Sequence, residues 1–196
     1  MADPHDVVLL ADIHANLEAF RAVVNHAVTL YGGAGAPEIW FLGDLFGRGP
    51  NPVAVWRRFR ELAPSFSVLG NHDLGLLGRY QNILIGGQWT GDYRRDDWEV
   101  ILQQRRILGA MDLLKLDGGG RPIAGAVFDD MAPWPILQTP RPGVVMIHGG
   151  REAPFDPDES RIRHALSWDY VKNEVHFCHT HHMIDWLLRH PEALDG

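Results

Sequence analysis

Five short polar motifs in this sequence carry side chains that commonly bind metal ions, and each follows directly on an apolar run. The motifs are Asp12-Ile13-His14, Gly43-Asp44, Gly70-Asn71-His72-Asp73, His148-Gly149 and His179-Thr180-His181. Residues two positions apart in an extended segment project to the same side. Asp12 and His14 have this spacing. His179 and His181 repeat it, so each pair can chelate one ion.

The candidate ligands outnumber the donors that one tetrahedral zinc ion uses. They are Asp12, His14, Asp44, Asn71, His148, His179 and His181. This mixture of carboxylate, amide and imidazole donors predicts a site with two metal ions. Two divalent cations, two carboxylates and one hydroxide leave about one positive charge, which attracts a phosphate anion. The predicted reaction is hydrolysis of a phosphate ester by a metal-bound hydroxide.

Apolar runs and helix signals predict the elements that position these motifs. The predicted strands cover 7–11, 38–42, 66–69, 144–147 and 175–178, with helices over 16–31 and 52–62. Asn16 is expected to cap the first helix, whose apolar face is predicted to be Leu17, Phe20, Val24 and Val28. Val53, Val55, Trp56 and Phe59 are predicted to face inward in the second. Strands alternating with helices predict a parallel sheet, and ligands collect at the carboxyl ends of such strands.

The remaining parts of the chain have other patterns. Residues 74–120 are predicted to form a helical insertion or cap that ends at a run of three glycines. Residues 121–143 are rich in proline, which favours extended edge segments and turns over a central strand. A length of 196 residues fits one domain, so residues 1–196 are predicted to be a single unit.

Composition narrows the class of protein. The chain is 45% hydrophobic and 22% charged, and it has no apolar run long enough to span a bilayer, so it is not expected to be a membrane protein. A formal net charge of -7 argues against general nucleic-acid binding. The acidic N-terminus does not resemble a signal peptide, and a cytoplasmic location is expected. The single cysteine, Cys178, excludes an internal disulfide.

The five motifs, taken in this order, resemble those of the calcineurin-like metallophosphoesterase superfamily. The similarity spans residues 6–182, is weak between 78 and 143, and is greatest to a compact bacterial and archaeal phosphodiesterase-like group. The resemblance implies an α/β fold in which two sheets form a sandwich flanked by helices. It also implies a phosphodiesterase or phosphomonoesterase that acts on a small phosphate ester, with the oligomeric state left open.

The resemblance implies roles for individual residues. Asp12, His14, Asp44 and His181 would hold one metal, and Asp44, Asn71, His148 and His179 the other. Asp44 would bridge the two ions. His72 would contact the phosphate and protonate the leaving oxygen, while Asp73 would orient the His72 ring. Four histidine ligands favour manganese or iron, with zinc, cobalt and nickel as alternatives.

Some features leave alternatives open. Arg48 stands where protein phosphatases of the superfamily keep a phosphate-binding arginine, and a solvated surface position is the alternative. A protein Ser/Thr phosphatase-like activity is therefore one rival function, and a non-catalytic interaction module with this fold is another. Cys178 replaces a usual glycine and is either a buried hydrophobe or a reactive thiol. Only 15 residues follow His181, so the second sheet is expected to be incomplete or the chain truncated.

Overall fold

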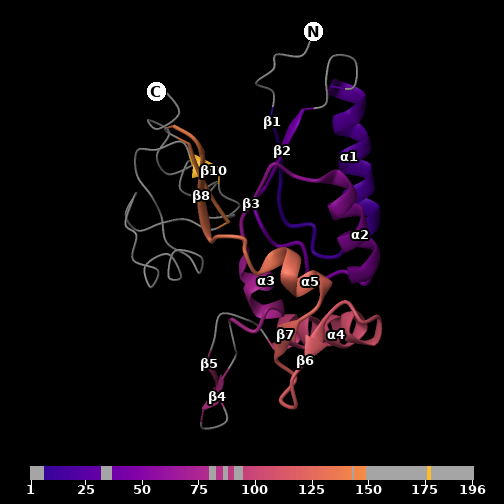
Figure 1. Ribbon diagram of the computed structural model, residues 1–196, viewed down its shortest axis with the longest axis vertical. Helices are drawn as coiled ribbons and strands as arrows, with labels where there is room; N and C mark the ends of the chain where they lie inside the picture. Colours follow the sequence, from indigo (N-terminus) through magenta and orange to yellow (C-terminus); the bar gives the residue numbers. More distant parts are fainter. Residues whose placement is uncertain are drawn as a thin grey trace.

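The computed structural model describes residues 7–31, 37–79, 83–85, 88–90, 95–142, 144–148 and 176–177. Two three-stranded sheets form its centre (Figure 1). Helices α1 and α2 lie against the outer side of the first sheet, and the second sheet lies on its other side. Helix α4 and the short strands β6 and β7 lie at the lower end in this view.

The first sheet is parallel, as predicted. It contains β1 (Val7–Leu10), β2 (Glu38–Phe41) and β3 (Phe66–Ser67) in the order β1-β2-β3. Val7 pairs with Glu38, and Trp40 pairs with Phe66, so the carboxyl ends of all three strands lie at the same edge. Strand β3 ends at Ser67, two residues earlier than predicted.

The two helices that connect these strands also agree with the sequence. Helix α1 covers Leu17–Tyr31, and the Ala19 N–H donates to Asn16 Oδ1 at 3.1 Å, which confirms the predicted cap. Helix α2 covers Pro52–Leu62. The prediction for Val28 is wrong, because its side chain is 58% exposed. The apolar stripe of α1 that contacts the core ends at Val24.

The second sheet has the order β10-β9-β8. Its strands are β8 (Leu137–Arg141), β9 (Val144–Ile147) and β10 (His176–Phe177). Strand β9 is parallel to β10 and antiparallel to β8. The edge segment expected among the prolines is β8, but the same region contains a helix that was not predicted, α5 (Ala126–Met131). It forms because Val127 and Met131, four residues apart, both bury their side chains completely in the core.

Side chains on opposite faces of β2 explain the layers. Trp40 of β2 and Leu42, which directly follows this strand, pack with Val68 and with Met146 of β9, which joins the two sheets face to face. Phe41, which points the other way, belongs to the larger core under α1, α2 and α5. The predicted α/β sandwich flanked by helices is confirmed.

The segment predicted as a helical insertion is mixed in structure. Helix α3 (Asn71–Leu76) leads into it, and strands β4 (Ile83–Ile85) and β5 (Gln88–Thr90) pair antiparallel ahead of helix α4 (Arg95–Ala110). Strands β6 (Lys115–Leu116) and β7 (Pro122–Ala124) form a second antiparallel pair. The expectation of a mostly helical segment holds only for α4. The assignment of residues 1–196 to a single domain stays a prediction. Within the described ranges, every helix is too short or too polar to span a membrane.

Candidate functional site

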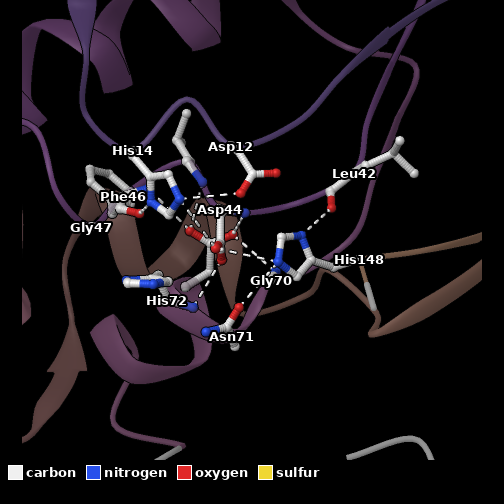
Figure 2. A network of polar contacts seen from close by, with 12 residues as sticks. Asp12, His14, Leu42, Asp44, Phe46, Gly47, Gly70, Asn71, His72 and His148 are labelled. Atoms are coloured by element: carbon white, nitrogen blue, oxygen red, sulfur yellow. Dashed lines mark hydrogen bonds and ion pairs between the residues drawn. The ribbon is translucent and has the colours of Figure 1, made fainter. Parts of the chain in front are cut away.

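The described motif residues meet at one edge of the first sheet (Figure 2). Asp12 and His14 follow β1, Asp44 follows β2, and Asn71 and His72 begin α3 just after β3. His148 follows β9 in the second sheet. The sequence-predicted ligands His179 and His181, together with Cys178, lie outside the described residues.

The backbone that presents these side chains adopts left-handed conformations. Asp12 has φ 54°, His14 has φ 47° and Asp44 has φ 62°, a region that costs side-chain-bearing residues free energy. Backbone hydrogen bonds hold the two loops together, because Asp12 N donates to Gly43 O at 3.0 Å and His14 N donates to Asp44 O at 2.9 Å. Strained backbone of this kind clusters at functional sites, where the surrounding structure holds it in place.

Each of two histidine rings is fixed by a backbone carbonyl. His14 Nδ1 lies 3.1 Å from Phe46 O, and His148 Nδ1 lies 2.8 Å from Leu42 O. A carbonyl only accepts hydrogen bonds, so each Nδ1 must carry the proton and donate it. In the neutral ring, Nε2 then presents a lone pair, which is the arrangement found in metal-binding histidines.

Both lone-pair nitrogens point toward carboxylates. His14 Nε2 lies 3.2 Å from Asp12 Oδ1 and 3.7 Å from Asp44 Oδ2. His148 Nε2 lies 3.3 Å from Asp44 Oδ2 and 3.1 Å from Asn71 Oδ1. Two electron-rich atoms at these distances repel each other unless a proton or a cation lies between them. The arrangement therefore favours positive charge at the centre of the cluster.

Burial and neighbouring charges shift the pKa values of His148, His14 and Asp44. Burial by itself would lower the pKa of His148, but the negative charge of Asp44 outweighs it and raises that pKa to about 9. The pKa of His14 is also raised, because its hydrogen bond to Asp12 and the charge of Asp44 outweigh burial. Burial would raise the pKa of Asp44, yet the nearby His148 holds it below its ordinary value. A metal cation would meet the same demand for positive charge.

Asp44 belongs to two groups of donors that could each hold a metal ion. Asp44 joins His14 and His72 in one group, and Asp12 and His148 in the other, with ligand atoms within 4.8 Å of one another. Its own side chain is only 2% exposed, and its Oδ1 accepts a hydrogen bond from His72 N at 2.9 Å. The mixed carboxylate and imidazole set fits divalent transition-metal ions.

The His72 ring lies beside His14. The two ring centroids are 4.7 Å apart and the planes meet at 81°, and His72 is 4% exposed. Its predicted contact to a phosphate stays a prediction, and His72 also belongs to the donor group that contains His14 and Asp44.

Asp73 does not orient the His72 ring, contrary to the prediction. Its carboxylate accepts hydrogen bonds from four backbone N–H groups, those of Asp44, Leu45, Phe46 and Gly70, at 2.8, 3.0, 3.3 and 3.2 Å. Asp73 thus ties the loop after β2 to the start of α3. Burial and the charge of Asp44 raise the pKa of Asp73 to about 7, although the hydrogen bonds from Gly70 and Phe46 act in the opposite direction.

Arg48 lies on the exposed side of the loop after Asp44. It lines a cavity of about 370 Å³ together with the ligand candidates Asp12 and His14 and apolar residues of α1. Arg48 is therefore at the border of the candidate metal centre.

One residue of the site was missed by the sequence analysis. Gln104 of α4 is 1% exposed, and its amide hydrogen-bonds to the backbone on both sides of Arg48. Its neighbour Gln103 is exposed. Nothing in the residues next to the two glutamines distinguishes them, so only their positions around the helix could show which one is buried. Only the apolar stripe through Trp98, Ile101 and Leu108 indicates which face of α4 is buried.

The sequence of this chain is similar to those of known proteins. A family model described as calcineurin-like phosphoesterase matches residues 5–193. The uncharacterized protein MJ0912 of Methanocaldococcus jannaschii is 41% identical over 73 residues, which are 37% of this chain and 28% of that protein. A symmetrical bis(5'-nucleosyl)-tetraphosphatase of Shewanella sp. (strain W3-18-1) is 37% identical over 79 residues, which are 40% of this chain and 27% of that enzyme.

Two solved structures share the fold. The crystal structure of a metallophosphoesterase from Sphaerobacter thermophilus aligns with a TM-score of 0.50 and 22% identity, covering 87% of this chain and 53% of that one. A putative diadenosine tetraphosphatase aligns with a TM-score of 0.50 and 20% identity, covering 85% of this chain and 59% of that one. The alignments thus span little more than half of each solved chain, and about a quarter of each of the two sequence relatives.

Proposed function

Because the chain belongs to the calcineurin-like phosphoesterase family, we propose that it hydrolyses a small phosphate ester at the cluster around Asp44. The observation that carries this proposal is the place of Asp44 in both donor groups, one with His14 and one with His148. A carboxylate shared in this way can bridge two cations. We therefore propose a dinuclear centre, in which His181 and His179 would complete the two ligand sets.

The donor set also supports a choice of metal. Imidazole suits transition metals better than magnesium, so manganese or iron is proposed, with zinc, cobalt and nickel as alternatives. When bound, two divalent cations lower the pKa of a water molecule and withdraw charge from the phosphoryl oxygens. The buried position of Asp44 and His148 strengthens this effect, because few water molecules screen the charges there.

The remaining residues act on the substrate. His72, held beside the His14 ring, is proposed to keep a proton at its imidazole and deliver it to the leaving oxygen. Arg48 is proposed to direct two N–H groups onto phosphate oxygens from the border of the cavity that Asp12 and His14 also line. Asp73 acts through the backbone, since it holds the loop that carries Asp44.

The relatives suggest which substrates to test. Enzymes named for dinucleoside tetraphosphates are similar to parts of this chain, so such a compound belongs in the screen beside simple monoesters and diesters. The protein Ser/Thr phosphatase alternative adds a phosphopeptide to the same screen. The cytoplasmic location remains a prediction from the sequence.

The experiment begins with metal analysis of the purified protein, for which about two ions per chain are expected. The metals are then removed with a chelator, and manganese, iron, zinc, cobalt or nickel is restored singly before each substrate is assayed. Hydrolysis that depends on the restored metal supports the proposal. A protein that binds about two ions per chain but hydrolyses none of the substrates would instead support the non-catalytic interaction module.

A further inference from the structure

The buried amide of Gln104 is hydrogen-bonded to the loop of residues 47–49. Gln104 Oε1 accepts the Gly47 N–H at 2.9 Å. Its Nε2 donates to Gly47 O at 2.5 Å and to Gly49 O at 2.6 Å. One side chain of α4 therefore satisfies three backbone groups in the two residues that flank Arg48, from 55 to 57 positions away in sequence.

This loop also contacts both histidine rings of the first donor group. A Cβ atom added at Gly47, whose φ is +133°, would lie 2.5 Å from His14 Nδ1 and 2.9 Å from His72 Nδ1. The loop backbone thus packs directly on the two rings, and only glycine allows that approach. Gly49 N in turn donates to His14 O at 2.5 Å. A shift of the loop would move Arg48 relative to the candidate metal centre.

The residue after Gln104 fixes a second part of the site. Arg105 is 5% exposed, and its Nε donates to Leu76 O at 3.0 Å while its Nη2 donates to Gly75 O. These carbonyls belong to α3, the helix that begins with Asn71 and His72. Two adjacent residues of α4 therefore hold both the loop that carries Arg48 and the helix that carries His72.

We propose that Gln104 is a positioning residue for phosphate recognition, which acts by holding Arg48 at the border of the metal centre. The inference rests on the proposed function, because it takes Arg48 to contact the phosphate. Arg48 is exposed between the buried Gly47 and the partly buried Gly49, and the backbone of these two neighbours sets where its side chain begins. A displacement of about 1 Å at a substrate-positioning group can cost roughly 100-fold in rate.

The test uses the metal-loaded full chain and a matched pair of variants. Gln104→Ala removes the three hydrogen bonds, and Gln103→Ala removes the same kind of side chain from the exposed neighbouring position. The Gly47 N–H donates a hydrogen bond to Gln104 Oε1, so faster hydrogen exchange at this amide reports that the loop is released. Calorimetric binding of inorganic phosphate and kcat/KM for a monoester and a diester report on recognition. Gln104→Met, which keeps the length of the side chain, is the second variant if the alanine variant does not fold.

Gln104→Ala should lower kcat/KM by about 10- to 100-fold with metal content unchanged. The loss should be larger for the monoester, because its dianion presents more negative charge to Arg48 than a diester does. In an Arg48→Ala background the same change should cost less than about 3-fold, because the group being positioned is already absent. Gln103→Ala should match the parent in every measurement.

Two results would overturn the proposal. One is an equal loss in the presence and absence of Arg48, which would show that Gln104 does not act through it. The other is faster exchange at Gly47 with unchanged phosphate binding and kinetics, which would leave Gln104 a purely structural residue. If the parent hydrolyses no ester, the proposed function fails, but phosphate binding still tests Gln104. Weaker binding in Gln104→Ala than in Gln103→Ala would support its role, and equal binding would overturn it.

Discussion

Replacing Asp73 with asparagine should destabilise the fold, although the two side chains have nearly the same shape. Asp73 Oδ2 accepts the N–H groups of Asp44 and Gly70, and Oδ1 accepts those of Leu45 and Phe46. An asparagine keeps one of these oxygens and places an NH₂ donor at the other position. Whichever way the amide is oriented, two buried N–H groups then face a donor.

The two unpaired N–H donors determine how much stability the variant loses. Asp73 is completely buried, so water cannot replace the missing acceptor. A buried donor left without an acceptor costs about 1–3 kcal/mol, so two such donors cost about 2–6 kcal/mol. The neutral amide also removes the repulsion from Asp44 that raises the pKa of Asp73, which offsets part of this cost, so the free energy of unfolding should fall by about 1 kcal/mol or more. A loss of that size is a large part of the total stability of a domain, which is usually about 5–15 kcal/mol.

Urea unfolding followed by tryptophan fluorescence measures this change. Parent and variant are compared with a chelator present, so that lost metal affinity does not contribute. The measurements are made at about pH 8, where the Asp73 carboxyl is mostly ionised, because its pKa is raised to about 7. Asp117→Asn is the matched control. Asp117 is exposed, and its Oδ1 accepts the N–H groups of Gly119 and Arg121. An asparagine can keep both hydrogen bonds through its single oxygen, so Asp117→Asn should lower the free energy of unfolding by less than about 0.5 kcal/mol. A loss below about 1 kcal/mol for Asp73→Asn, with an unchanged denaturant dependence, would refute the reasoning.

Three further substitutions test the site itself. Asp44→Asn should remove most activity and weaken both metal sites, because a neutral amide bridges two cations poorly, and near-native activity with full metal content would contradict this. His72→Ala should keep both metals but lower turnover by about 10²–10⁴-fold, less for an activated phenol leaving group, whereas loss of a metal on elemental analysis would make His72 a ligand. Arg48→Ala should leave metal content unchanged and lower kcat/KM by a contact worth about 1.5–3 kcal/mol, more for monoesters than diesters. Unchanged kinetics on both ester classes would place Arg48 on the solvated surface.

The sequence alone determined where the described ligand candidates would lie. Each follows an apolar run, and the order of strands and helices places the carboxyl ends of the first three strands at one edge, as observed for Asp12, Asp44 and Asn71. This could be predicted because alternation, helical spacing and capping residues are local properties of the chain. The cap at Asn16 and the bounds of α2 were predicted for the same reason.

The tertiary structure decided which atoms these residues present and what holds them. The carbonyl that fixes the His148 ring belongs to Leu42, 106 residues away, and the amide that holds the loop at Gly47 belongs to Gln104, 57 residues away. Asp73 turned out to bind four backbone N–H groups instead of a ring. Contacts of this kind depend on how separate loops approach one another in space. Spacing along the chain contains no record of that approach, because the same local pattern is compatible with many arrangements of distant segments.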